Sequence, residues 1–441
     1  MDPRISAALG SFDFSADFIG NSQLPLLDDY RRHHARADLS AHNLLVIQHQ
    51  LGTTVPLVQA LIDDGIDPNR TWFVDIPYST HPDVREALLQ LAGDPTHCPA
   101  LFTDPLVDYT SAQLTRVIST LFDMLDHHCN ADLIVLDDGA YFLRALSVLH
   151  AISHEAARAF AGARMIEQTT RGHEFIKSHA DDLRQLGIRA TSIARAQTKL
   201  QFEAPFIGAS VATALASKAR ALRPEGVSHV AVLGYGAVGE ACARQLHHEF
   251  PRANMTVVDN DEEQLRAATT AHPGATVQAR LAETEPRNPH ELGQFDIVVG
   301  CTGRNSFTLE DRRLLAPNAI LASGSSAAVE FDRAGFVDLA DYRENDEVEI
   351  LNRPEAHAMG IHADIRLRFE RGVEVTFANA GFPVNFDGRR ECLPVTAIQP
   401  TRCLMYAAVQ QSLEQLDAVL HGLGKDADEW IHARGLAHLA G

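Results

Sequence analysis

The chain has 441 residues, which is too long for one hydrophobic core and predicts two or three domains. Its 45% hydrophobic and 22% charged residues are typical of a globular protein, and its formal net charge of −20 disfavours nucleic acid or an anionic membrane surface as a partner. Six cysteines without a Cys-x-x-Cys pair, no signal-like start and no apolar run of about 18 residues predict a reduced, cytoplasmic protein outside the membrane.

The first 205 residues alternate between short apolar runs and helical patterns. A helix is predicted over 24–33, and further helices over 55–64, 83–92 and 111–127. Apolar runs typical of buried parallel strands lie at 43–49, 71–76 and 131–136, and strands followed by polar loops are predicted at 163–172 and 190–195. This alternation predicts an α/β domain with a parallel sheet, which binds ligands at the carboxyl ends of its strands.

A glycine-rich turn follows the long helix predicted over 205–222. An apolar run ends at Gly234, and Gly234, Gly236 and Gly239 have the spacing Gly-x-Gly-x-x-Gly immediately before a helical pattern. The first glycine permits a tight turn, the second lets a pyrophosphate approach the backbone, and the third lets helix and strand pack closely. The helix N-terminus offers unpaired N–H groups to phosphates. Strand, turn and helix in this order predict a Rossmann dinucleotide-binding domain.

The cofactor predicted for this domain is NAD. Asp259 ends the next apolar run, 20 residues after Gly239, where a carboxylate accepts hydrogen bonds from an adenosine ribose. No Arg or Lys at 260–263 would neutralise a 2′-phosphate, which argues against NADP. Two later apolar runs, 296–303 and 319–326, end in glycine and small hydroxyl residues suited to a nicotinamide ribose. The predicted cofactor contacts of this domain are Gly234, Gly236, Ala237, Val238, Gly239, Asp259, Asn260, Thr302, Gly303, Ser323, Gly324 and Ser325.

The end of the chain is predicted to be helical. After an apolar run at 373–378, one helix is predicted over about 400–423 and another over 425–441. The predicted division is an α/β domain over 1–205, the Rossmann domain over 206–384 and a C-terminal segment over 385–441. The 22 histidines include no His-Glu-x-x-His or similar pair, so no metal site is predicted.

Short pieces of sequence, in one order along the chain, also carry a family resemblance. They lie at 46–49, 136–139, 167–172, 198–203, 234–239, 301–303, 329–332 and 383–385. With them the chain resembles S-adenosyl-L-homocysteine hydrolase. The resemblance implies a substrate domain, a Rossmann domain with permanently bound NAD, and a C-terminal segment that returns to the substrate domain. It also implies transient oxidation of a ribose 3′-hydroxyl, which acidifies the neighbouring proton so that a thiol is eliminated and water adds.

The resemblance implies a role for individual residues. Such chemistry needs a base for a carbon acid, a cation near the developing oxyanion and a carboxylate for the hydroxyl proton. Lys199 and Glu203 match the pair beside the 3′-hydroxyl, with Glu203 in place of an aspartate. Asp138 and His49 match the pair for proton removal or water handling. Further cofactor contacts are implied at Thr169, Thr170 and Asn385, and substrate contacts at Thr53, Glu167 and Gln168.

The chain departs from this family mainly at positions that would contact the base and the ribose of the substrate. The adenine-reading glutamate is Thr53, a ribose-binding glutamate is Gln168, and 391–394 replaces a His-Pro pair near adenine. Because buried partners left unpaired discriminate strongly between substrates, these changes argue against efficient S-adenosylhomocysteine hydrolysis. Further departures are Leu51, Ala194, Ala204 and Ser326.

The leading interpretation is an NAD-dependent enzyme that oxidises a secondary hydroxyl of a nucleoside-like or polyol small molecule. The hydride either returns to the product, as in elimination or epimerisation, or leaves as NADH. One alternative is a genuine S-adenosylhomocysteine hydrolase with a remodelled base pocket. Another is a catalytically silent NAD-binding regulator or scaffold, favoured by the joint changes at Gln168, Ala204 and Ser326. A homo-oligomer is expected, as a dimer rather than the family's tetramer, because the tail lacks the family's lysine and tyrosine that close over NAD.

Overall fold

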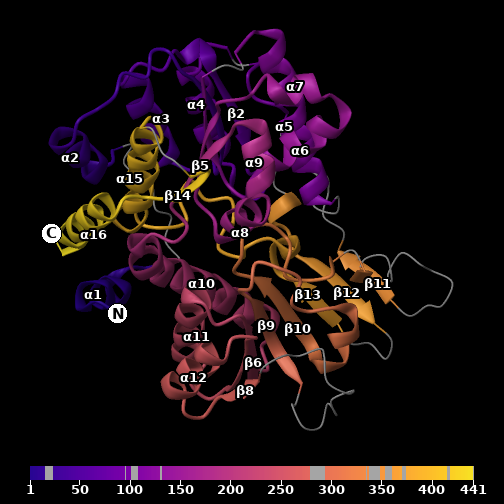
Figure 1. The fold of residues 1–441 in the computed structure, drawn as a ribbon. Coiled ribbons are helices and arrows are strands. Elements are labelled where there is room, and N and C mark those ends of the chain that lie inside the picture. Colours follow the sequence, from indigo (N-terminus) through magenta and orange to yellow (C-terminus); the bar gives the residue numbers. More distant parts are fainter. Residues whose placement is uncertain are drawn as a thin grey trace.

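Two β-sheets with flanking helices carry the fold of this computed structural model (Figure 1). The described residues are 1–14, 23–94, 96–100, 108–129, 132–278, 294–333, 335–336, 348–352, 360–369, 374–414 and 418–440. The predicted α/β class with parallel sheets is confirmed. Of the predicted elements, residues 131, 373, 415–417 and 441 lie outside the described part of the chain.

The first sheet is entirely parallel, in the order β14-β5-β4-β3-β1-β2. Its strands are β1 Asn43–Gln48, β2 Thr71–Asp75, β3 Leu133–Asp137, β4 Arg164–Glu167, β5 Arg189–Ser192 and β14 Leu420–Gly422. Every residue of β1, β2 and β3 is buried, as expected for strands covered on both faces. The strand order reverses between β1 and β3, so the ends of these two strands form a topological switch point, where open α/β sheets bind ligands.

Helices alternate with the strands of this sheet; those predicted over 24–33, 55–64, 83–92 and 111–127 are among them, and the others were not predicted. The helices are α1 Pro3–Ser11, α2 Pro25–His33, α3 Thr54–Asp63, α4 Pro82–Leu91, α5 Tyr109–Asp126, α6 Tyr141–Ile152, α7 His154–Arg158, α8 Thr170–Ser178 and α9 Ala180–Leu186. Asp108 caps α5 by accepting a hydrogen bond from the Ser111 N–H at 3.0 Å. The Asp137 carboxylate accepts the first N–H groups of α6, from Tyr141 and Phe142.

The second sheet contains a Rossmann strand order. Its order is β11-β12-β13-β10-β9-β6-β7-β8. The six strands β8-β7-β6-β9-β10-β13 are parallel to one another and have the order 3-2-1-4-5-6 of the dinucleotide-binding fold. The strands are β6 His229–Leu233, β7 Asn254–Val258, β8 Thr276–Gln278, β9 Phe295–Gly300, β10 Leu315–Ser323, β11 Val348–Asn352, β12 Ile365–Phe369 and β13 Glu374–Phe377. The antiparallel pairing of β11 and β12 was not predicted.

Among the described residues, the α-helices that accompany this second sheet are α10 Ala204–Leu222, α11 Ala237–Glu249 and α12 Glu262–Ala271. Helices α10 and α11 pack so closely at Gly208 that a Cβ atom there would lie only 2.5 Å from Ala241 Cβ. The absence of a side chain at Gly208 permits this approach. The order reverses between β6 and β9, and the glycine-rich turn lies at this second switch point.

The C-terminal segment returns to the first sheet. Helices α15 Val395–Ser412 and α16 Lys425–Ala440 lie beside α2, and residues 403–409 belong to the same buried cluster as β1 (Figure 1). The helix predicted over 400–423 is wrong at both ends, since α15 begins at Val395 after Pro394 and ends at Ser412. Leu420–Gly422 pairs instead with β5, because an open sheet edge offers backbone partners that local helical periodicity does not reveal.

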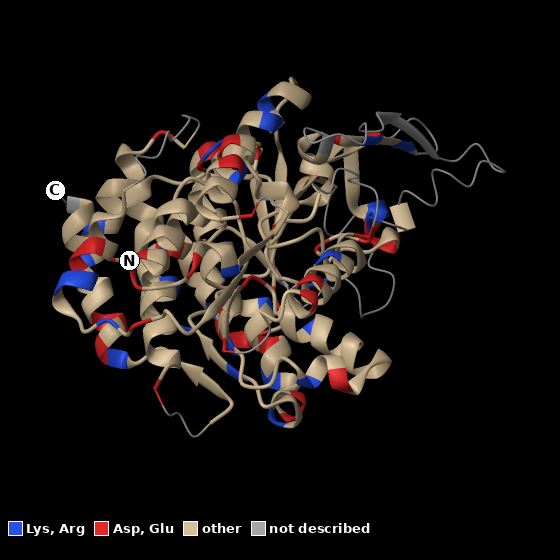
Figure 2. Ribbon diagram, turned by 90° about the horizontal axis from the view of Figure 1, so that it is seen from above, with Lys and Arg blue, Asp and Glu red and all other residues tan. Residues whose placement is uncertain are grey.

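Charge of both signs is spread over the outer helices. Figure 2 shows Lys and Arg interspersed with Asp and Glu rather than gathered over one element. Among the described residues, no helix combines the length and apolarity that crossing a bilayer requires.

Candidate functional site

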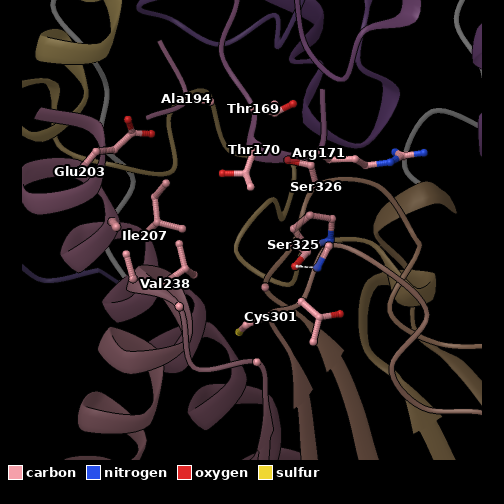
Figure 3. Close-up of a pocket in the computed structure, with 18 of the residues that line it drawn as sticks. Thr169, Thr170, Arg171, Ala194, Glu203, Ile207, Val238, Cys301, Ser325 and Ser326 are labelled. Carbon is pink, nitrogen blue, oxygen red and sulfur yellow. Dashed lines mark hydrogen bonds between the residues drawn. The ribbon is translucent and has the colours of Figure 1, made fainter. Parts of the chain in front are cut away.

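A cavity of about 1000 Å³ lies where the carboxyl ends of the two sheets meet. Thr169, Thr170 and Arg171, which follow β4, form one wall, and Cys301, Ser325 and Ser326 face them from the second sheet (Figure 3). Both topological switch points therefore open into one space.

The glycine-rich turn lines this cavity. Gly234 has φ of +89°, and a Cβ atom there would lie 2.9 Å from the backbone of Cys301, so this position favours glycine for both conformation and space. A Cβ atom at Gly239 would lie 1.9 Å from Gly234 O, which ties α11 closely to β6. A Cβ atom at Gly236 would meet nothing within 4 Å, so the backbone at this position faces open space.

Acidic side chains fix the loops on either side of the turn. Asp259 lines the cavity and accepts hydrogen bonds from Tyr235 N at 2.6 Å and Asp261 N at 2.9 Å. The buried Glu330 accepts hydrogen bonds from Thr302 N at 2.7 Å and Gly303 N at 2.6 Å. Burial raises the pKa of the Glu330 carboxyl although these donors act against it. No role was predicted for Glu330, although it lies in the family-like piece at 329–332.

Lys199 and Glu203 form an ion pair at the cavity wall. The π-helical turn Thr198–Glu203 places them four residues apart with Lys199 Nζ 2.7 Å from Glu203 Oε2. Glu203 also accepts a hydrogen bond from Thr401 Oγ1, and its side chain is only 4% exposed. π-Helical turns are rare and often occur at functional sites.

The C-terminal helix holds this turn in position. The Asp428 carboxylate on α16 accepts hydrogen bonds from Gln197 N at 2.6 Å and from Thr198 N at 3.1 Å. Thr198 Oγ1 also donates to the Asp428 backbone carbonyl at 3.2 Å. The position of Lys199 therefore depends on a segment more than 200 residues away in sequence.

His49 and Asp138 form a second pair across the first switch point. His49 follows β1 and Asp138 follows β3, and His49 Nε2 lies 3.1 Å from Asp138 Oδ2. Ser79 contacts His49 Nδ1 and Gln168 donates to Asp138. Burial alone would raise the pKa of the Asp138 carboxyl, but the charge and hydrogen bond of His49, the Gln168 amide and Lys199 lower it below its usual value. Asp138 is thereby held as a carboxylate.

Most of the residues predicted from sequence line this one cavity. They are His49, Asp138, Gln168, Thr169, Thr170, Lys199, Glu203, Gly234, Gly236, Ala237, Val238, Asp259, Asn260, Thr302, Gly303, Gly324, Ser325 and Asn385.

Four predicted residues lie behind the cavity wall. Gly239 packs under the turn, and Ser323 Oγ donates to Ser325 O at 3.1 Å. The buried Glu167 accepts hydrogen bonds from Ala140 N at 2.8 Å and Thr169 N at 2.6 Å, so it joins the starts of α6 and α8. Thr53 is fully buried and donates to Glu391. The substrate contacts predicted for Glu167 and Thr53 therefore do not agree with where these side chains lie.

A buried polar cluster stands where the sequence departs from the family. Glu391 Oε2 accepts hydrogen bonds from Thr53 N and Oγ1, both at 3.0 Å, and Arg402 Nε donates to Thr53 Oγ1 at 3.2 Å. Arg402 and Glu391 both line the cavity, and among the described residues neither forms an ion pair within 4.0 Å. Burial raises the pKa of Glu391 and lowers that of Arg402, while each opposes the shift of the other. Arg402 was not predicted as a site residue.

A comparison with protein-family models matches part of the second sheet. The family model of the TrkA-N domain matches residues 230–311, from β6 through the glycine-rich turn to beyond β9. Two proteins of Mycobacterium tuberculosis, named uncharacterized protein MT0113 (strain CDC 1551 / Oshkosh) and uncharacterized protein Rv0104 (strain ATCC 25618 / H37Rv), are each 27% identical over 380 residues. The match covers 83% of this chain and 64% of each relative, so this chain spans less than two thirds of their length.

Solved structures are similar at a more distant level. A dipicolinate synthase structure from Bacillus halodurans covers 86% of this chain and 99% of its own, with 11% identity and a TM-score of 0.38. An L-alanine dehydrogenase covers 89% of this chain and 99% of its own, with 12% identity and a TM-score of 0.34. The TrkA-N match itself includes the glycine-rich turn that lines the cavity.

Proposed function

We propose that this chain is an NAD-dependent enzyme that oxidises a secondary hydroxyl of a nucleoside-like or polyol substrate. The observation that carries the proposal is that the Lys199–Glu203 pair, the His49–Asp138 pair and the glycine-rich turn all line the same cavity. A hydroxyl placed there has proton-handling groups on one side and a dinucleotide-binding turn on the other.

The residues of the second sheet fit a dinucleotide. The open space at Gly236 leaves room for a pyrophosphate, and the N-terminus of α11 has no side-chain cap that would compete for its N–H groups. Asp259 offers a carboxylate to a ribose and repels a 2′-phosphate, so NAD is favoured over NADP. When bound, NAD would supply the hydride acceptor.

The Lys199–Glu203 pair and the His49–Asp138 pair divide the proton transfers between them. Lys199 Nζ donates to the substrate oxygen and stabilises negative charge there, while Glu203 takes up the hydroxyl proton through Lys199. Asp138 is held ionised and contacts His49, so this pair is suited to remove a proton from carbon next to the oxidised centre. Without that second step, the reaction is a simple alcohol oxidation.

The Arg402–Glu391 cluster supports a substrate other than S-adenosylhomocysteine. Thr53 stands where the S-adenosylhomocysteine hydrolase family has the glutamate that reads adenine. Its hydroxyl donates to Glu391 and accepts a hydrogen bond from Arg402. A buried site whose hydrogen-bonding groups do not match those of adenine selects strongly against a ligand that carries adenine. Release of thiol from S-adenosylhomocysteine at a rate above that of Lys199→Ala would instead support a genuine hydrolase.

The experiment is to incubate the purified chain with NAD and a panel of secondary alcohols, among them nucleosides and cyclic polyols. Reduction of NAD by at least one of them, lost in Lys199→Ala, is expected. Net NADH release would identify a dehydrogenase, whereas product formed without net NADH would identify transient oxidation. If no alcohol in a broad panel reduces NAD or is converted to product, the silent NAD-binding alternative replaces the proposal.

The domain division at 205 and 384 and a homodimer are part of the same proposal. The segment after 384 carries Thr401, which donates to Glu203, and Arg402, which lines the cavity. It also carries Asp428, which accepts hydrogen bonds from Gln197 N and Thr198 N beside Lys199. Light scattering of the full chain is expected to give twice the chain mass.

A further inference from the structure

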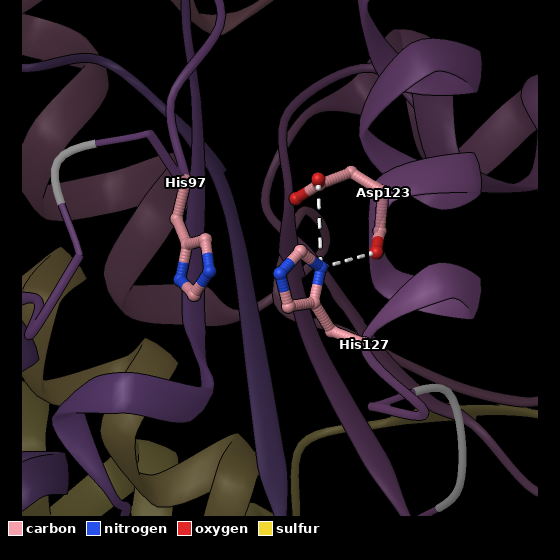
Figure 4. Close-up of side chains that lie close together, drawn as sticks. All are labelled: His97, Asp123 and His127. Carbon is pink, nitrogen blue, oxygen red and sulfur yellow. Dashed lines mark hydrogen bonds and ion pairs between the residues drawn. The ribbon is translucent and has the colours of Figure 1, made fainter.

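A second group of chemically reactive side chains lies on the first sheet, away from the cavity. His97, Asp123 and His127 each offer a ligand atom, and these atoms lie within 4.8 Å of one another (Figure 4). His97 packs against Trp72 near the amino end of β2, whereas the cavity is formed at the carboxyl ends of the strands. None of the three residues lines the cavity.

His97 is the buried member of the group. Its side chain is 4% exposed, and neither ring nitrogen has a hydrogen-bond partner among the described residues. Its backbone is fixed, because Phe73 N donates to His97 O at 2.9 Å, and its ring stacks on Trp72 with centroids 4.1 Å apart. His97 Nε2 lies 3.9 Å from Asp94 Oδ2, which is beyond hydrogen-bond distance. Buried polar atoms in folded proteins almost always have a partner, so this imidazole points to one that the described residues do not supply.

The other two side chains are already oriented as metal ligands usually are. His127 Nδ1 contacts the Asp123 backbone carbonyl at 2.8 Å, which leaves Nε2 to bind a metal. Trp72 Nε1 donates to Asp123 Oδ2 at 2.7 Å and orients that carboxylate. Hydrogen bonds from a ligating histidine to a carbonyl, and from a donor to a ligating carboxylate, are typical second contacts of metal sites.

We propose that His97, Asp123 and His127 bind Zn²⁺ or a related divalent transition metal, with water completing the coordination. Two imidazoles and one carboxylate are a ligand set that Zn²⁺ accepts, and three protein ligands leave the fourth position of a tetrahedron to solvent. Tetrahedral ligands about 2.1 Å from the metal lie about 3.4 Å apart, so the ligands must close in by small side-chain rotations. The half-exposed Asp123 and His127 have room for them. The metal would fasten the last turn of α5 to the edge of the sheet.

The chain contains a matched control for this site. His33 on α2 contacts Asp29 through the same distances as His127 contacts Asp123, with Nδ1 2.8 Å from the backbone carbonyl and 3.5 Å from the carboxylate. The exposure of the two histidines is also nearly the same, at 50% and 51%. Among the described residues, no third ligand completes a cluster at His33.

The test is calorimetric titration of the chelator-treated full chain with ZnCl₂. One equivalent is expected to bind, and Co²⁺ in its place is expected to give the visible absorption of a nitrogen- and oxygen-ligated ion. His127→Gln, Asp123→Asn and His97→Phe are each expected to weaken binding by about tenfold or more, while His33→Gln leaves it unchanged. His127→Gln changes an exposed side chain, so its folding is not at risk.

Absence of saturable Zn²⁺ binding would overturn the proposal. So would binding that none of the three substitutions weakens, or that His33→Gln weakens equally. The proposed alcohol oxidation is measured separately and does not depend on these residues.

Discussion

Lys199 is the residue on which the proposed chemistry depends most directly. Replacing it with methionine removes the cation beside the substrate oxygen and breaks the 2.7 Å contact with Glu203. The rate of NAD reduction in a single turnover is expected to fall by about 10²- to 10⁴-fold, the usual contribution of a positioned proton donor or acceptor.

Lys218→Met is the control for this substitution. Lys218 pairs with Asp364 at 2.7 Å and does not line the cavity, so its loss is expected to leave the rate unchanged. A Lys199→Met rate within about twofold of the unmodified chain would remove Lys199 from the mechanism.

Glu391 makes the stability of the chain depend on pH. Burial raises the pKa of its carboxyl above the ordinary value of 4.5, so its favourable contribution is complete below 4.5 and is lost as pH rises through the folded-state value. Glu391→Gln removes this titration and still accepts a hydrogen bond from Thr53. Urea unfolding at about pH 5 and about pH 8 is expected to show the variant gaining stability over the unmodified chain as pH rises. An advantage that stays constant with pH contradicts this.

At the residue scale, sequence predicted side chains that follow strands better than side chains that depend on packing. His49 and Asp138 follow adjacent parallel strands, so their meeting at a switch point follows from topology. Glu167 ends a strand too, yet it turns inward to the N–H groups of two helices. Arg402 lies inside a buried helix, and His97 meets Asp123 only through tertiary packing. Neither position has a local sequence signal.

The glycine-rich turn provides a test of the proposed cofactor. A methyl group at Gly236 meets no protein atom and needs no left-handed backbone, so Gly236→Ala is expected to fold with a loss of about 1 kcal/mol or less. It would occupy the space proposed for the pyrophosphate, and NAD affinity is expected to fall by about tenfold or more. Calorimetry measures this fall.

Gly274→Ala is the matched control, because Gly274 also faces open space but lies in a turn outside the cavity. Equal NAD affinity in the two variants would show that a pyrophosphate does not approach Gly236.

Helix α16 positions the turn that carries Lys199, although the two lie far apart in sequence. Asp428→Ala leaves Gln197 N and Thr198 N without their acceptor, which is expected to cost about 1–2 kcal/mol of stability, as for other lost caps. The Lys199 side chain then loses its fixed position, and kcat is expected to fall by about tenfold with NAD affinity unchanged. Asp426→Ala, on the exposed side of the same helix, is the control. An unchanged kcat in Asp428→Ala would show that α16 does not position Lys199.

At the element scale, the long apolar strands and the helices α2 to α5 and α10 were predicted well because their periodicity is local, whereas α6 to α9 were not predicted. The end of α15 and the strand Leu420–Gly422 were not, because a three-residue strand carries no periodicity and forms only where β5 offers an edge. The antiparallel strands β11 and β12 extend the Rossmann order in a way that the glycine motif does not specify.

The preference for NAD over NADP can be measured on the whole chain, because each cofactor stabilises the folded state according to its affinity. A ligand that binds only the folded state stabilises it by about 2.7 kcal/mol at 100 times its dissociation constant. NAD is expected to raise the unfolding midpoint more than NADP at equal concentration, because Asp259 lines the cavity and repels a 2′-phosphate. Asp259→Ser is expected to reduce the difference between the unfolding midpoints measured with NAD and with NADP. Equal stabilisation of the unmodified chain by both cofactors would contradict the predicted preference for NAD.

The return of the C-terminal segment to the first sheet has a consequence for biosynthesis. During translation, the ribosome delivers every strand from β6 to β13 before it delivers Leu420–Gly422 and α16. The nascent Rossmann unit can therefore fold early, whereas β5 keeps an open edge and the turn that holds Lys199 lacks Asp428 until the last segment emerges. Assembly of the cavity is thereby postponed to the end of synthesis, and the unfinished edge is where nascent chains would be expected to associate wrongly.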